Sequence, residues 1–156
     1  MISLRARRNA LLRPIALSLL VAYLGGLALV AFWPTPVDRG AYSTIESLLV
    51  RLHAHGVPEW FNYGLVEFTA NIVLFVPLGL LSVILVGADR VWHAVMAGFA
   101  SSCLIELGQL VFLPSRFATP VDVLANTLGA VVGALLALFT LAAVGNARVK
   151  TGPVPA

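Results

Sequence analysis

Carboxylate and amide side chains occur in pairs inside long apolar stretches of this sequence. The two members of each pair are about one helical turn apart, so they would share one face of a helix. The pairs are Glu67 with Asn71, Glu106 with Gln109, and Asp122 with Asn126. A charged group in a bilayer costs at least about 2.5–3.5 kcal/mol, and such groups are retained where they face protein or water. The pattern therefore predicts helices whose polar faces meet.

Converging carboxylates and amides could perform two kinds of chemistry. They could bind a polar headgroup through hydrogen bonds, with Arg116 contacting an anionic group. Alternatively, Glu106 and Asp122 could be the acid/base pair of an enzyme or the oxygen ligands of a cation. The sequence has no nucleophile constellation, phosphate loop or zinc motif, which favours binding. We accordingly expect no metal and no cofactor. An interhelical network that only stabilises the fold is the remaining alternative.

The composition indicates that these residues lie in a membrane. Of the 156 residues, 60% are hydrophobic and 11% are charged, and the mean hydropathy is +0.95. Soluble domains carry roughly 25% charged residues. Cys103 is the single cysteine, which excludes an internal disulfide. The basic cluster near the N-terminus adjoins an apolar run, as in a membrane-orientation signal, so we expect no nucleic-acid partner.

Four stretches have the length of about 20 apolar residues that a membrane helix needs. They cover approximately residues 11–33, 65–86, 91–113 and 121–144. A secretory signal peptide is the weaker alternative for the first stretch. The chain is thus predicted to be an all-α membrane protein, a bundle of four transmembrane helices forming a single domain over residues 1–156. Residues 145–156 are predicted to be a disordered cytoplasmic tail, and Pro77 to kink the second helix or open its hydrogen bonds.

Arginine and lysine residues predict the orientation, because they favour the cytoplasmic side. With both termini in the cytoplasm, the basic residues on the inside are Arg5, Arg7, Arg8, Arg13, Arg90, Arg148 and Lys150. Those on the outside are Arg39, Arg51 and Arg116. This N-in, C-in arrangement places all three polar pairs in the outer half of the bilayer.

The segment between the first two stretches is predicted to contain a short amphipathic helix on the outer face. Its apolar residues recur at helical spacing, at Ile45, Leu48, Leu49 and Leu52. Ser43 with Glu46 resembles a capping box, and Gly56 suits a helix end. His53 and His55 are interpreted as surface residues rather than metal ligands.

Small residues follow the polar pairs on the last two stretches. They are Ala94, Gly98 and Ser102 before Glu106, and Ala125, Gly129, Gly133 and Ala137 after Asp122. Such ridges let membrane helices approach closely, so we expect them to bring the polar faces together.

Several motifs together resemble the VanZ-like family of bacterial integral membrane proteins. They are Asn71-Ile-Val-Leu-Phe-Val-Pro77-Leu-Gly79, Ile105-Glu106-Leu-Gly-Gln109, Arg116, and Asp122-Val-Leu-Ala-Asn126-Thr127-Leu-Gly129. The similarity spans about residues 65–140. One departure is that the turn before the last helix lacks the acidic residue often found there. The resemblance implies functional positions at Asn71, Glu106, Gln109, Arg116, Asp122 and Asn126, and architectural positions at Pro77, Gly79 and Gly129.

The resemblance also implies a location and a role. The protein would be a multi-pass protein of the bacterial cytoplasmic (inner) membrane, and the namesake of the family is associated with tolerance of teicoplanin, a lipoglycopeptide. The expected partners are membrane lipids and a lipid-linked envelope precursor or lipoglycopeptide, with a homo-oligomer as a further possibility. The predicted outward-facing pocket comprises Glu67, Asn71, Glu106, Gln109, Arg116, Asp122 and Asn126. An integral membrane enzyme acting on an envelope lipid or precursor is the alternative function.

Overall fold

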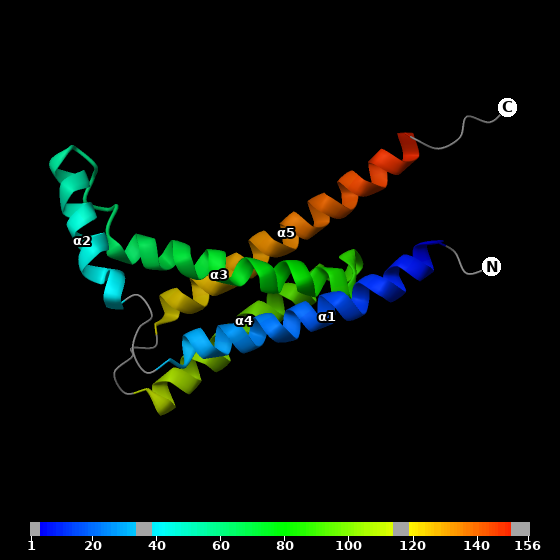
Figure 1. Ribbon diagram of the computed structural model, residues 1–156, viewed down its shortest axis with the longest axis horizontal. Helices are drawn as coiled ribbons and strands as arrows, with labels where there is room; N and C mark the ends of the chain where they lie inside the picture. The colour runs from blue at the N-terminus through cyan, green and yellow to red at the C-terminus, as the bar shows by residue number, and fades with distance from the viewer. Residues whose placement is uncertain (1–3, 34–38, 114–118, 151–156) are drawn as a thin grey trace.

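The computed structural model describes residues 4–33, 39–113 and 119–150, which form helices and short connections without β-strands. The elements are α1 (Leu4–Ala31), α2 (Arg39–Ala54), α3 (Tyr63–Val86), the 3-10 helix η1 (Ala88–Arg90), α4 (Val91–Phe112) and α5 (Pro120–Lys150). Figure 1 shows α1, α3, α4 and α5 running along one another. The start of α1 and the end of α5 lie at one end of this bundle, and α2 lies at the other.

Four of the described helices are long and apolar enough to cross a membrane, as predicted. Their apolar segments are Arg13–Ala31, Tyr63–Val86, Ala88–Phe112 and Pro120–Val144. Large apolar side chains cover the outside of the bundle, including Phe139, Phe112 and Leu104. A surface of this kind suits lipid rather than water. The chain is a multi-pass membrane protein, and its orientation stays a prediction.

Helix α3 packs against α5 through direct contact between backbones. A Cβ atom on Gly133 would lie 2.0 Å from the carbonyl oxygen of Val76, and one on Gly129 would lie 2.2 Å from that of Ile72. A Cβ atom on Gly79 would lie 2.0 Å from the carbonyl oxygen of Ala130. Only glycine allows such an approach. The predicted role of the small-residue ridge on α5 is confirmed.

The ridge on α4 is also buried in the bundle. Ala94, Gly98, Ser102 and Glu106 are all buried. A Cβ atom on Gly98 would lie 2.3 Å from the Cβ atom of Ala130. Helix α4 therefore approaches α5 through the same small residues that precede its carboxylate.

Helix α3 continues through Pro77 as one α-helix from Tyr63 to Val86. Proline has no N–H to donate to the preceding turn. Near this point the hydroxyl group of Tyr23 on α1 donates a hydrogen bond to the carbonyl oxygen of Leu74. This bond joins α1 to the middle of α3, a contact that the sequence did not indicate.

Helix α2 confirms the predicted amphipathic helix but not its predicted start. It begins at Arg39, so Ser43 lies inside the helix and the predicted capping box with Glu46 is wrong. Residues 39–42 contain no proline, and nothing there prevents the helix from starting earlier.

The end of α2 is as predicted. Gly56 has a φ of +94°, its N–H donates to the carbonyl oxygen of His53, and the N–H of Val57 donates to that of Leu52. These bonds form a Schellman motif, which requires the left-handed backbone that glycine readily adopts. The ring nitrogens of His53 and His55 hydrogen-bond to the backbone oxygens of Phe61 and Arg51.

The C-terminal end of the chain differs from the prediction. Helix α5 continues to Lys150, whereas a disordered tail was expected from residue 145. The sequence has no proline between Pro120 and Pro153, so no proline interrupts the helix before Lys150. The remaining part of the predicted tail, residues 151–156, lies outside the described residues.

Candidate functional site

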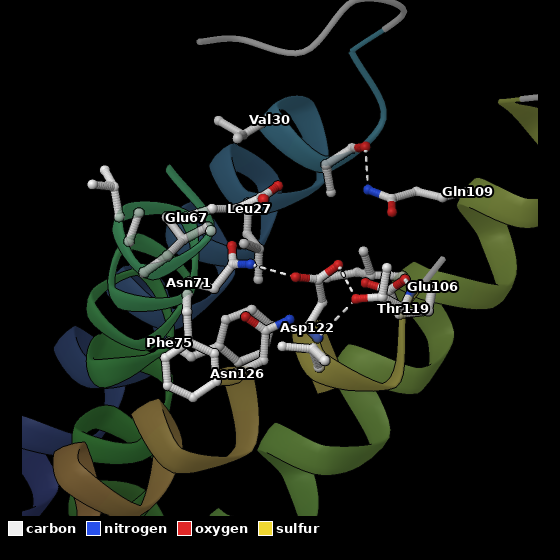
Figure 2. Close-up of a pocket in the computed structure, with 18 of the residues that line it drawn as sticks. Leu27, Val30, Glu67, Asn71, Phe75, Glu106, Gln109, Thr119, Asp122 and Asn126 are labelled. Carbon is white, nitrogen blue, oxygen red and sulfur yellow. Dashed lines mark hydrogen bonds between the residues drawn. The ribbon is translucent and has the colours of Figure 1, made fainter. Parts of the chain in front are cut away.

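A cavity of about 800 Å³ opens at the end of the bundle where α2 lies. Residues of α1, α2, α3, α4 and α5 line it. Six predicted site residues lie in its wall, namely Glu67, Asn71, Glu106, Gln109, Asp122 and Asn126. Figure 2 shows these side chains converging from α3, α4 and α5. The seventh predicted residue, Arg116, lies outside the described residues.

Asp122 is the point where α5 and α3 are joined by side chains. Its Oδ1 atom accepts a hydrogen bond of 2.9 Å from Nδ2 of Asn71. Its Oδ2 atom accepts one of 2.8 Å from the hydroxyl group of Thr119. Both donors are neutral, so these two bonds stabilise the carboxylate without cancelling its charge. The polar faces of α3 and α5 therefore meet, as predicted, through a direct hydrogen bond between Asn71 and Asp122.

Thr119 links Asp122 to Glu106 at the start of α5. The backbone N–H of Thr119 donates to Oε2 of Glu106 at 3.1 Å, and its Oγ1 atom accepts from the backbone N–H of Asp122 at 3.1 Å. Thr119 thus caps the helix, with Pro120 as the first helical residue. In a capping box the third helical residue would accept from the N–H of the cap, and here Glu106 of α4 takes that place.

Thr119 is a residue of this site that the sequence analysis missed. A signal for it was present, because Thr119-Pro120-x-Asp122 has the form of a capping box at a helix start. That pattern indicates a cap, and it does not indicate that a carboxylate from another helix completes it.

The two buried amides have different partners. Nε2 of Gln109 donates to the carbonyl oxygen of Ala31 at 2.8 Å, which satisfies a backbone group at the end of α1. Nδ2 of Asn126 donates to Oγ of Ser102 at 2.8 Å and joins α5 to α4. The Oδ1 atom of Asn126 is buried and has no hydrogen-bond donor among the described residues. Gln109 therefore has a clear structural role, while Asn126 keeps one polar atom unused.

The remaining wall of the cavity is mostly apolar. Leu27 and Val30 of α1, Leu74 and Phe75 of α3, and Ile105 of α4 line it. Glu67 lines the same cavity and is solvent-exposed, one turn before Asn71 on α3. The wall of the cavity thus combines polar and apolar side chains, which suits a molecule that has both characters.

The described residues contain no group of three or more His, Cys, Asp or Glu side chains that could hold a metal ion. The carboxylates of Glu106 and Asp122 nevertheless lie close enough to hydrogen-bond with the same residue, Thr119. This proximity is the geometric basis for an acid/base pair.

A model of the VanZ/LLP1 family matches residues 20–142. The chain belongs to the VanZ/LLP1 family. The match contains every described residue that lines the cavity, from Leu27 to Asn126, so the cavity is part of the family domain. No curated protein and no solved structure matches the chain.

Proposed function

We propose that this VanZ-like protein binds the polar headgroup of an amphipathic envelope molecule in its cavity. The observation that carries the proposal is a cavity of about 800 Å³ that is lined by carboxylates and amides as well as by apolar residues. Pockets for small molecules are typically about 300–1,000 Å³ and have few, well-placed polar groups. The cavity fits a headgroup and the first part of an acyl chain.

The proposed location is the bacterial cytoplasmic membrane, with the cavity facing outward. The distribution of arginine and lysine supports this orientation. The placement of the start of α1 and the end of α5 at one end of the bundle, away from the cavity, agrees with it. In this orientation the cavity would meet lipid-linked envelope precursors and lipoglycopeptides. Arg116, which precedes α5 in the sequence, would contact an anionic part of such a molecule.

The proposed physiological effect is tolerance of teicoplanin, and drug susceptibility tests it. A sensitive Gram-positive host would express the wild type, Asp122→Asn or Asp89→Asn at equal membrane levels. Asp89 is exposed in η1, outside the cavity, so its variant makes the same change in charge elsewhere. We expect the wild type and Asp89→Asn to raise teicoplanin tolerance without changing vancomycin susceptibility, and Asp122→Asn to lose the effect. Unchanged susceptibility with the wild type would exclude the resistance role in that host.

A second candidate function is an integral membrane enzyme acting on an envelope lipid or precursor. It is supported by the shared contact of Glu106 and Asp122 with Thr119. If these carboxylates also held a cation, Mg²⁺ or Ca²⁺ would raise the melting temperature, and Glu106→Gln and Asp122→Asn would abolish the shift. Identical melting of the wild type in chelator and in either cation would count against a metal-dependent enzyme.

A further inference from the structure

Asn126 is the most deeply buried polar residue in the wall of the cavity, with an exposed fraction of 5%. Its Nδ2 atom donates to Ser102, while its Oδ1 atom is buried without a donor among the described residues. A buried acceptor without a donor is unfavourable, and such groups are rare in folded proteins. A ligand that supplies a donor at this point would remove the penalty.

Asp122 lies one turn before Asn126, on the same side of α5. Figure 2 shows the amide of Asn126 below the bonded side chains of Asn71 and Asp122. The carboxylate of Asp122 accepts from Asn71 and Thr119, both of which are neutral. An ionised carboxylate held by neutral donors attracts a cation more strongly in a restricted cavity than in water.

The described residues lining the cavity include no lysine, arginine or histidine. No described lining residue therefore supplies a positive charge, and a cationic group of the ligand would complement the carboxylates of the cavity. We infer that the cavity recognises a primary ammonium group carried by a membrane lipid, with Asp122 binding its charge and Oδ1 of Asn126 accepting one of its N–H bonds. A primary ammonium has three donors and no acceptor.

The apolar wall identifies the lipid as the carrier of this group. Val30, Ala70 and Val121 line the cavity and are exposed, so the chain of a lipid that follows its headgroup could contact them. A water-soluble amine would leave these exposed apolar side chains uncovered. This inference rests on the proposed headgroup binding and specifies the class of headgroup.

Native mass spectrometry of the purified full-length chain tests the inference with three lipids of equal acyl chains. Phosphatidylethanolamine has a donating ammonium, phosphatidylcholine a cation without N–H donors, and phosphatidylglycerol hydroxyl donors without a cation. We expect phosphatidylethanolamine to bind about tenfold more tightly than the other two, the size of one hydrogen bond to a charged group. Equal binding of all three would overturn the inference.

Two variants connect the preference to the residues that carry it. Asp122→Asn and Asn126→Leu should each reduce the affinity for phosphatidylethanolamine to that for phosphatidylcholine. Asp89→Asn should retain the preference, because Asp89 lies in η1 and does not line the cavity. Asp122→Asn preserves shape, so it stays informative if Asn126→Leu folds poorly. An unchanged preference in Asp122→Asn would overturn the inference.

Free ethanolamine distinguishes the two sources of an ammonium group. We expect millimolar ethanolamine to leave bound phosphatidylethanolamine in place, because it lacks the chain that contacts the apolar wall. If ethanolamine displaced the lipid with an affinity equal to that of phosphatidylethanolamine, a soluble amine would be the ligand. The assignment to a lipid would then be wrong.

A variant that fills the cavity separates this inference from the proposed function. Ala70 lines the cavity and is exposed on α3, so Ala70→Phe should reduce binding of every lipid. Ala100→Phe is the matched control on α4, since Ala100 is exposed and does not line the cavity. If Ala70→Phe weakens the binding of all three lipids while Asp122→Asn weakens the binding of none, the proposal of headgroup binding is supported. The inference of ammonium recognition would then be wrong. If neither variant changes binding, both proposals fall.

Discussion

Helices α3 and α5 meet in two regions that have opposite character. Near the start of α5, side chains bridge the helices, as in the hydrogen bond between Asn71 and Asp122, and a cavity lies beside them. Further along, the backbones touch, and Gly129 and Gly133 leave no room for a Cβ atom against α3. One helix pair thus contains an open polar region and a closed glycine region.

The two regions have different roles: the closed region stabilises the fold, and the open region is the proposed binding site. Hydrogen bonds between membrane helices contribute about 0.6 kcal/mol on average, so the open region adds little to stability. Close packing of small residues fixes the distance and register of the two helices. Gly129 lies two turns after Asp122 on α5, so the closed region also determines where Asp122 stands relative to Asn71. The open region depends on the closed one for its geometry.

The largest effect is expected in the closed region, for Gly133→Ala. The added Cβ atom would lie 2.0 Å from the carbonyl oxygen of Val76, a backbone atom that cannot rotate away. We expect a loss of about 1–3 kcal/mol in the free energy of unfolding, typical of overpacking. Thermal unfolding in detergent measures it, and lipid binding should weaken as the helices separate.

Gly26→Ala is the matched control for this substitution. A Cβ atom at Gly26 of α1 meets nothing within 4 Å. We expect its stability to be unchanged or higher, because alanine favours a helix by up to about 1 kcal/mol relative to glycine. Equal melting temperatures for Gly133→Ala and Gly26→Ala would show that the close packing at Gly133 does not stabilise the fold.

The sequence predicted the general arrangement of both regions. Apolar length determines the four membrane helices, and a step of one helical turn determines which polar residues share a face. The small residues after Asp122 indicated the close approach of α5, since few other side chains permit it. These features are local, and a single sequence records them directly.

Contacts between distant segments could not be predicted in the same way. The hydrogen bond of Gln109 with the carbonyl oxygen of Ala31 and that of Tyr23 with the carbonyl oxygen of Leu74 join helices far apart in the chain. Backbone carbonyl groups are the same in every residue, so sequence patterns do not identify which one accepts. The hydrogen bond of Thr119 with Glu106 of α4 could not be predicted for a related reason, because it depends on how the two helices cross.

An intermediate effect is expected in the open region, for Thr119→Ala. The variant loses the hydroxyl group that accepts from the backbone N–H of Asp122 and donates to its carboxylate. Loss of such a cap costs about 1 kcal/mol. Amide hydrogen exchange should accelerate in the first turn of α5, with little change near Gly133. Thr119→Ser retains the hydroxyl group and should exchange as the wild type does; equally fast exchange in Thr119→Ser would show that the hydroxyl group is not the cause.

The smallest effect is expected for Tyr23→Phe, at the side of the open region. The substitution removes the hydroxyl group that bonds to the carbonyl oxygen of Leu74 and retains the ring against the apolar core. We expect a loss of about 0.6 kcal/mol, the average for a hydrogen bond between membrane helices. The melting temperature in detergent, compared with that of Gly133→Ala, measures the difference. A loss as large as that of Gly133→Ala would mean that the attachment of α1 stabilises the fold as strongly as glycine packing does. The open region would then be a second structural support, because α1 supplies part of the apolar wall of the cavity.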